Sequence, residues 1–369
     1  GAFAWPSGRH YTYLGCPVKV PAVCAYPKKL EVVAAHHTSP VPPPSWESHG
    51  RRHLIRIVPP VPGLWLCNVH APCTCNEWVS ATNRVLGAVP TPNDRGLAAL
   101  KRELRLMSQR CGHKQPWSLE RVRDSFRGPR LRRYQLAFDS LMLDPLVRAD
   151  ARIQSFVKAE KFDPYAKENP DPRMIQARSP RYNLVVAKYL RPVEHFIYNL
   201  CGKSGLREVA KGLNAQERAS LLISKFQRFD DPVCIGLDAS RWDKHVDLSV
   251  LQLEHGFYQS IFPNSPELQR ILSWQCENKC RTSSGVKYTC VGGRMSGDVN
   301  TALGNCLLMV AMMRAACRGL GLSNYELLDD GDDCLVVVER GDVHKLDRLP
   351  QKFLDFGQEL KLETVVDDV

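Results

Sequence analysis

The stretch LLDDGDDCLVVVER, residues 327–340, places four aspartates around one glycine and follows them with apolar, β-branched residues. Asp-Gly and Gly-Asp pairs favour tight hairpin turns because they tolerate the positive φ that such turns need. The pattern predicts a strand, a turn and a buried strand, with Asp332 and Asp333 at the tip. Acidic residues are common in turns for that reason alone. Four crowded carboxylates repel one another, however, and their crowding favours a bound cation.

A second source of carboxylates follows the short apolar run VCIGLD (233–238), which is typical of a buried strand. Asp238 ends this run, and Asp243 follows five residues later, where we expect it to face a substrate. Carboxylates from two neighbouring strands are what a two-metal site needs, and their hard oxygens favour Mg²⁺ or Mn²⁺. The hairpin and this strand together predict a site for phosphoryl transfer.

A glycine-containing loop at 294–300 precedes a helical pattern with apolar residues three and four positions apart. The loop could grip a sugar or phosphate through backbone N–H groups and small polar side chains. An ordinary helix start, with Ser296 as its N-cap, explains the same residues and is the more common case. Elsewhere, the pattern predicts helices over 76–107 and 343–356 and a strand over 359–366.

Two segments concentrate positive charge. Residues 101–133 fit a solvated helix face, which is the more common explanation of a charge run, and their density of arginine also suits a phosphate backbone. Residues 156–192 mix Lys and Arg with prolines, which predicts extended pieces and turns rather than a helix. Ordering a long basic segment of this kind costs conformational entropy unless a polyanion or a packed partner fixes it.

The composition is that of a basic globular protein. The 369 residues carry a formal charge of +11 at pH 7, which favours a polyanionic partner without identifying it. The 14 cysteines are scattered, and we expect them to be mostly reduced in a cytosolic setting. There is no secretory signal and no apolar run of the roughly 18 residues that a membrane span needs.

In this order, DASRWD (238–243), SGDVNTALGN (296–305) and GDD (331–333) resemble the three palm motifs of viral RNA-dependent RNA polymerases. The basic segment with FVKAEK (156–161) and DPRMIQARSPRY (171–182) is similar to the family's triphosphate-contacting fingers motif. The particular residues of these motifs, and the upstream segment PWSLERVRDSFRGPRLRRYQLAFDSL, resemble the polymerases of the tombusvirus-like (Tombusviridae) group of positive-strand RNA viruses.

The resemblance implies a role for each matching residue. Two Mg²⁺ or Mn²⁺ ions would be bound by the catalytic carboxylates Asp238 and Asp332, with Asp333 as a weaker or outer ligand. The ribose 2′-hydroxyl would be recognised by Asp243, Ser296, Thr301 and Asn305. The triphosphate would be held by Lys158, Lys161 and Arg173, whereas Arg178 and Arg181 fit either the triphosphate or the template backbone. Lys361 and Lys352 fit the general acid loosely, and we take Lys361 as the candidate.

The resemblance also implies an α+β, right-hand polymerase fold with fingers and a palm formed by an antiparallel sheet and flanking helices. The expected division is an N-terminal proline-rich arm (1–63), fingers (64–230), a first palm segment (231–262), a fingers insertion (263–290) and the rest of the palm (291–369). We expect the thumb to be largely missing, because the family's thumb and its primer-gripping motif should follow residue 369.

The expected activity is RNA-directed RNA synthesis from NTPs, with an RNA template and product as partners. The non-Met start suggests part of a longer protein. In this viral group the polymerase region usually follows a membrane-anchoring replication protein. The resemblance therefore implies other viral replication proteins, a membrane contact through a segment outside this chain, and a location in membrane-associated complexes of the host cytoplasm.

Three other interpretations stay open at this point. A reverse transcriptase uses a similar palm, but it usually has a bulkier residue where Gly331 stands and a bulky block against the 2′-hydroxyl. A nonenzymatic RNA-binding protein would explain the arginines but not the carboxylates beside buried strands. An inactive polymerase fragment would keep every motif and lack activity.

Overall fold

The computed structural model describes residues 67–163, 166 and 170–367 and, ahead of them, four short strands. These are β1 (His10–Tyr13), β2 (Cys16–Lys19), β3 (Glu31–Val33) and β4 (Leu54–Ile57). Apart from these strands, the predicted proline-rich arm lies outside the described residues. β1 pairs with β2, and β4 pairs with β5 (Cys67–His70).

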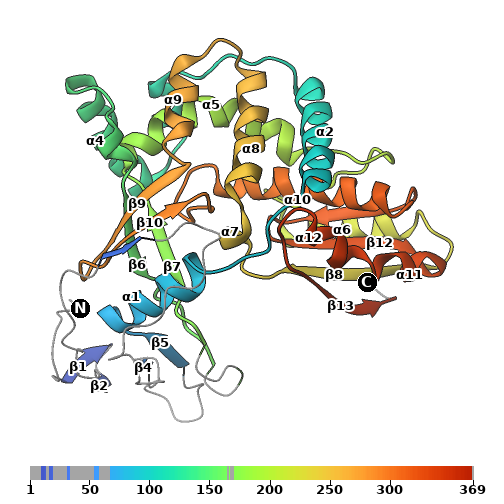
Figure 1. The fold of residues 1–369 in the computed structure, drawn as a ribbon, viewed down its shortest axis with the longest axis horizontal. Coiled ribbons are helices and arrows are strands. Elements are labelled where there is room, and N and C mark those ends of the chain that lie inside the picture. The colour runs from blue at the N-terminus through green and yellow to red at the C-terminus, as the bar shows by residue number, and fades with distance from the viewer. Residues whose placement is uncertain are drawn as a thin grey trace.

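The opening motif lies in a four-stranded antiparallel sheet with the strand order β11-β12-β8-β13 (right side of Figure 1). The strands are β8 (Pro232–Ala239), β11 (Glu326–Asp329), β12 (Asp333–Glu339) and β13 (Leu360–Val366). The predicted hairpin and both predicted strands are therefore confirmed. Five consecutive residues of β8 are buried, and its sequence is accordingly a continuous apolar run rather than an alternating one.

The long helix α10 (Thr301–Gly319) is buried on nearly all sides and contacts α2 (Asp94–Cys111), α5 (Pro180–Tyr198) and α12 (Leu349–Leu354). The predicted helix after the 294–300 loop is confirmed, although Val299 lies in the turn before it. Its apolar residues join one large core with the inner faces of β8 and β12. This shared core fixes the position of the hairpin relative to α10.

The second sheet is mixed and has the strand order β3-β10-β9-β6-β7 (left side of Figure 1). Its later strands are β6 (Ile153–Val157), β7 (Met174–Ala177), β9 (Glu277–Thr282) and β10 (Lys287–Val291). A separate apolar cluster joins Trp78 and Val85 to the inward side chains of these strands. The two residues come from α1 (Thr74–Ser80) and from a π-helical turn, η2 (Ala81–Val85).

Two predictions about the N-terminal half need correction. The helix expected over 76–107 is interrupted between η2 and α2, because Pro90 and Pro92 lie in the intervening segment, and Asn93 then caps α2. The basic segment expected to be extended up to 192 becomes helical at Pro180, which is the first residue of α5. A proline fits that position without strain, because the first helical N–H has no partner within the helix.

The remaining helices complete the fold. They are α3 (Leu119–Asp124), α4 (Gly128–Leu143), η3 (Arg148–Ala151), α6 (Ala215–Phe226), α7 (Trp242–His245), α8 (Leu248–Ile261), α9 (Pro266–Ser273), η4 (Arg340–Asp342) and α11 (Val343–Leu346). The helix expected over 343–356 is therefore two short ones, α11 and α12. In Figure 1, α4, α8 and α9 lie in the upper part, α7 lies near the centre, and α6 and α11 lie at the antiparallel sheet. Among the described residues, no helix combines the length and apolarity needed to cross a membrane.

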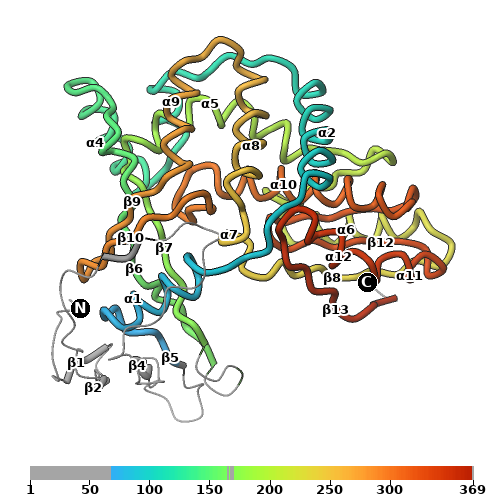
Figure 2. Tube along the Cα trace, viewed as in Figure 1, coloured from blue at the N-terminus to red at the C-terminus, as the bar shows by residue number. Residues whose placement is uncertain are grey.

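Figure 2 follows the chain from β5 and α1, beside the mixed sheet, to α2, which contacts α8 and α10. The two sheets thus carry different parts of the predicted site. Asp238 and Asp332 belong to the antiparallel sheet and its turn, whereas Lys158 and Arg173 flank β6 and β7. The functional question is whether these two parts face the same space.

Candidate active site

Strand pairing brings the two predicted sources of carboxylate together. Asp333 at the start of β12 is the direct partner of Asp238 near the end of β8. Direct partners in an antiparallel pair point to the same face and have Cβ atoms about 5 Å apart. Asp332 precedes this pair in the turn, where Gly331 adopts a φ of 107° that a side chain would strain. The tight turn explains why glycine stands between the two Asp-Asp pairs.

The four crowded aspartates separate into two kinds. Asp329 is fully buried, and its Oδ1 accepts a hydrogen bond from the Gly331 amide at 3.1 Å. Burial raises the pKa of Asp329 well above its ordinary value, which favours the neutral form of this side chain. Asp330 is ion-paired with Lys211 at 2.9 Å and with Arg218 at 2.7 Å. The charge that remains for a ligand is therefore that of Asp332 and Asp333, which are both exposed.

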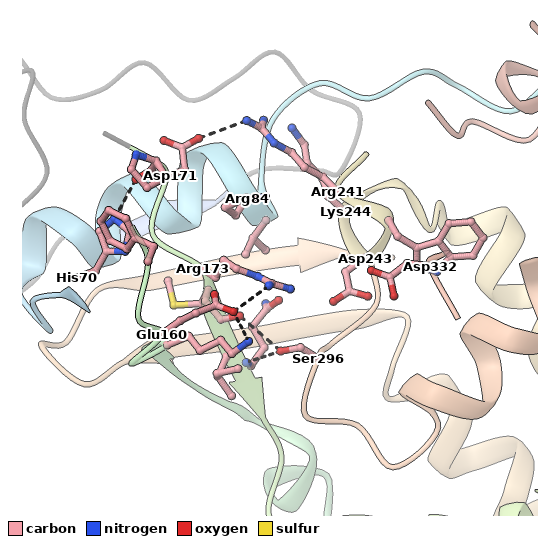
Figure 3. A pocket seen from close by; sticks show the side chains of 18 of the residues that line it. His70, Arg84, Glu160, Asp171, Arg173, Arg241, Asp243, Lys244, Ser296 and Asp332 are labelled. Atoms are coloured by element: carbon pink, nitrogen blue, oxygen red, sulfur yellow. Dashed lines mark hydrogen bonds and ion pairs between the residues drawn. The ribbon is translucent and has the colours of Figure 1, made fainter. Parts of the chain in front are cut away.

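Three of the predicted carboxylates line one cleft of about 800 Å³. They are Asp238, Asp243 and Asp332. Figure 3 shows Asp243 and Asp332 close together on one side, facing Arg173 and Glu160 across the cleft. Asp333 instead lines a neighbouring hollow with Glu363, although it is the strand partner of Asp238. Its pKa is raised by burial and by the charges of Asp332 and Asp238.

Asp243 lies in the short helix α7, which begins after Arg241 in a left-handed conformation with φ 49°. Burial, together with the nearby Asp332 carboxylate, raises the pKa of Asp243 to about 6. Arg294 and a hydrogen bond from Asn305 act in the opposite direction and keep the shift smaller. Asp243 is therefore mostly a carboxylate at neutral pH.

The other predicted ribose-contacting residues occupy different positions. Ser296 lines the cleft, and its Oγ accepts a hydrogen bond from the Gln176 amide at 3.1 Å. Asn305 is buried behind Asp243. Thr301 does not line the cleft, because its hydroxyl donates to the Met295 carbonyl at 2.8 Å. Ser296 is not the N-cap of α10, since that position belongs to Asn300.

The opposite wall of the cleft is basic. Lys158, Lys161 and Arg173 all line it, as expected for residues that would hold a triphosphate. Glu160 lies between two of them and accepts from Lys158 at 3.0 Å and from Arg173 at 3.3 Å. These ion pairs are partly exposed to solvent and therefore weak, so an anionic ligand can replace them.

The structure corrects the predictions for Arg178 and Arg181. Arg178 is 2% exposed, and its guanidinium donates at 2.6 Å to each of three acceptors, the Asp298 carboxylate, the Ala151 carbonyl and the Asn278 amide oxygen. Arg181 donates to Asp150 at 3.1 Å and to Ser140 at 2.6 Å. Neither residue lines the cleft. Both guanidinium groups are already used to fix the backbone around β7 and α5.

Sequence reasoning missed two arginines in the cleft wall. Arg84, at the end of η2, lines the cleft, and its Nε is buried without a hydrogen-bond acceptor among the described residues. Arg241 pairs with Asp171 at 3.3 Å, as Figure 3 shows. Arg241 lies inside the DASRWD motif and could have been found there. Arg84 belongs to no recognisable pattern, because folding alone brings η2 to the cleft.

The candidate general acid lies on the third strand of the same row. Lys361 of β13 is the direct partner of Asp238, on the side opposite Asp333. Lys361 is exposed, so its ammonium group is accessible from solvent. Lys352, the other lysine considered, lies on α12 and pairs with Asp355 at 3.7 Å. Strand register thus distinguishes two lysines that the sequence left equivalent.

The donors in the cleft fit a hard divalent cation. Within residues 67–163 and 170–367, no three Asp, Glu, His or Cys side chains are already gathered as a metal cage. Mg²⁺ in phosphoryl-transfer sites is usually bound by one or two carboxylates, with waters and substrate phosphates completing the shell. Asp238 and Asp332, both exposed on the cleft wall, provide such an incomplete set.

An α+β fold with exposed aspartates on a central antiparallel sheet, facing a basic cleft, defines the class of nucleotide-handling proteins to which polymerases belong. Sequence comparison identifies the family within that class. The protein-family sequence model described as viral RNA-dependent RNA polymerase matches residues 47–369. The chain belongs to this family.

Curated relatives agree with this family. The chain is 44% identical to the RNA-directed RNA polymerase of groundnut rosette virus (strain MC1) over 256 residues, covering 68% of this chain and 30% of that protein. Identity to the enzyme of tomato bushy stunt virus (strain Cherry) is 37% over 289 residues, covering 77% and 35%. For turnip crinkle virus it is 37% over 284 residues, covering 76% and 36%. The chain spans about a third of the length of these relatives.

Proposed function

We propose that this chain carries the catalytic centre for RNA-templated RNA synthesis, in which a ribonucleotide is transferred from an NTP to an RNA 3′-hydroxyl. The observation that carries the proposal is that Asp238 and Asp332 share one cleft with Lys158, Lys161 and Arg173. The carboxylate wall would hold two Mg²⁺ or Mn²⁺ ions. When bound, such ions make the attacking hydroxyl more acidic and balance the charge of the leaving pyrophosphate.

The basic wall would bind the triphosphate. In this structure Glu160 forms ion pairs with Lys158 and Arg173. A triphosphate carries more charge than one carboxylate and would displace Glu160 from both partners. Arg84 would supply a further contact, since its buried Nε lacks an acceptor among the described residues. The phosphates would then lie between this wall and the aspartates.

Asp243 and Ser296 would recognise the sugar. Both line the cleft, and a carboxylate with a pKa of about 6 is mostly ionised at pH 7 and accepts a hydrogen bond from a 2′-hydroxyl. A deoxyribose lacks that donor, so a site built around it discriminates against dNTPs. Neither side chain is large enough to block the hydroxyl, which favours this function over reverse transcription.

Lys361 would deliver a proton to the leaving pyrophosphate. Its pairing with Asp238 puts both side chains on one face of the sheet. Replacing Lys361 with alanine should lower kcat and leave the KM for NTP within about twofold, because such a proton acts at the transfer step rather than in binding. A rise in KM with unchanged kcat would instead make Lys361 a binding residue.

The family resemblance supports a division of labour between the two sheets. The sheet β11-β12-β8-β13 would be the palm, and the sheet β3-β10-β9-β6-β7 would belong to the fingers. The partners would be the RNA template, the RNA product and NTPs. Other replication proteins and host membranes would be reached through segments outside this chain, in cytoplasmic replication complexes.

The proposal is tested with an Asp332→Ala variant of the protein. Primed incorporation of labelled NTP in Mg²⁺ should fall by about 10³-fold or more, because several kcal/mol of metal-dependent stabilisation is removed. RNA affinity, measured by fluorescence anisotropy, should change by less than about twofold, since the cation wall is intact. Incorporation near the wild-type level would refute the site. A wild-type protein that binds RNA and incorporates nothing would favour the nonenzymatic alternative.

A further inference from the structure

A buried ion pair lies directly behind the sugar-facing side of the cleft. Arg294 donates to Glu254 of α8 through Nη1 at 3.1 Å and through Nη2 at 2.5 Å. Their side chains are 1% and 0% exposed. Glu254 also accepts from Tyr258 at 2.9 Å and from Asn300 at 3.2 Å, so its oxygens are well satisfied. Burial opposes the charge on both partners, but their attraction raises the pKa of Arg294 and lowers that of Glu254.

The pair is linked to Asp243 through one amide. The Nε of Arg294 donates to the Oδ1 of Asn305 at 2.9 Å. Because a guanidinium can only donate, this bond fixes which end of the amide is the oxygen. The NH₂ end is then the end that can face Asp243, and the Asn305 side chain lowers the pKa of that carboxyl group. Reversing the amide would bring its oxygen against the carboxylate.

The backbone makes a second connection between the same residues. The amide N–H of Arg294 donates to the carbonyl oxygen of Asp243 at 2.7 Å. Gly293, immediately before it, donates to the Val246 carbonyl at 2.9 Å. The 293–294 segment therefore holds the short helix α7 from behind while the Arg294 side chain orients Asn305. Both connections act on the position of Asp243.

Helix α10 is shaped around this ion pair at Gly304. A Cβ at that position would lie 2.3 Å from Glu254 Oε1 and 2.6 Å from Arg294 Nη2. Gly304 has no positive φ that would explain the glycine. In a buried helix, glycine is less favourable than alanine by about 1 kcal/mol. The space it leaves is the space that the ion pair fills.

We propose that the Glu254–Arg294 pair is a positioning device for sugar selection, which orients the Asn305 amide so that Asp243 is aimed at the ribose of the incoming nucleotide. The inference rests on the proposed function and deepens it. A packing role alone would be served as well by apolar side chains, since buried ion pairs can often be replaced by hydrophobic residues. An apolar side chain at 294 cannot orient the amide, because it has no donor.

The test compares ATP and dATP as substrates of the protein. Arg294→Met removes the donor, and a second variant that combines it with Glu254→Gln avoids leaving a buried carboxylate unpaired. In both variants we expect kcat/KM for ATP to fall about tenfold, mainly through KM. We expect kcat/KM for dATP to change by less than about twofold, because dATP has no 2′-hydroxyl to lose. Arg294→Lys, which keeps a donor, should restore part of the loss.

A matched control uses the buried Lys225–Glu326 pair, whose side chains are 0% and 4% exposed and lie on α6 and β11. The variant Lys225→Met/Glu326→Gln should lower the melting temperature and leave the ATP-to-dATP ratio unchanged. Equal losses for ATP and dATP in the Arg294 variants would leave the ratio unchanged, make the pair purely structural and overturn the inference, as would an undiminished kcat/KM for ATP. A wild-type protein inactive with both substrates would instead count against the proposed function.

Discussion

The two walls of the cleft are built differently. The acidic wall rests on paired strands, where register alone puts Asp238, Asp333 and Lys361 in one row. The basic wall consists of long side chains around β6 and β7, held by partly exposed ion pairs to Glu160. A strand partner cannot move without breaking the ladder, whereas a lysine or arginine can change rotamer at little cost. The acidic wall is therefore suited to fixed chemistry, and the basic wall to a ligand that enters and leaves.

The largest expected effect separates an aspartate of the acidic wall from a buried aspartate behind it. Asp238→Asn should reduce NTP incorporation by about 10³-fold, because an exposed carboxylate needed for a cation is lost. Asp329→Asn, the same chemical change, should leave incorporation within about threefold, since Asp329 is fully buried, does not line the cleft and has a raised pKa that favours its neutral form. Incorporation assays on both variants check this. A comparable loss in Asp329→Asn would mean that its charge is used.

A second matched pair separates two arginines that lie five residues apart. Arg178→Met should lower the free energy of unfolding by about 3 kcal/mol, because Asp298 is left buried without its partner. Arg173→Met should leave the melting temperature unchanged within about 1 °C, as its ion pair is half-exposed. Thermal and urea unfolding measure both. Equal destabilisation would contradict the division between a structural and a ligand-binding arginine.

The same Arg173→Met variant should act on binding instead of stability. We expect the KM for NTP to rise about tenfold with kcat changed by less than about threefold, because the contact is made in the ground state as well. Glu160→Gln should lower KM, since it removes the carboxylate that competes for Lys158 and Arg173. Steady-state kinetics on a fixed primer–template measure both. A fall in kcat with an unchanged KM would mean that Arg173 acts in the transfer step rather than in binding of the NTP.

The smallest effect is a gain of stability at the sugar site. Because the pKa of Asp243 is raised from 3.8 to about 6, ionised Asp243 destabilises the folded state. This penalty is full above pH 6, fades as pH falls from 6 towards 3.8, and is absent below 3.8. Asp243→Asn should therefore stabilise the fold by about 1 kcal/mol at pH 7.5, a figure reduced for contact with solvent. Melting temperatures from pH 4.5 to 8 in EDTA should show the gain shrinking on the acid side.

Local sequence patterns predicted the parts of the site that lie on regular strands. The hairpin at 326–339 and the strand ending at Asp238 follow from turn chemistry and apolar runs, and both are present. The basic segment was harder, because Pro180 was taken as a breaker and instead begins α5. A proline has opposite meanings at the first turn of a helix and in its interior, and a single sequence does not say which position it occupies.

The sequence by itself determined which carboxylates accompany the hairpin and the strand, because turn preference and the strand period act over a few neighbouring residues. Only the tertiary structure decided which charges remain for a ligand. Arg178 is neutralised by Asp298, 120 residues away, and Asp330 by Arg218, 112 residues away, whereas burial raises the pKa of Asp329. The state of a charge depends on its partners and its exposure in space, and neither is encoded in the residues beside it.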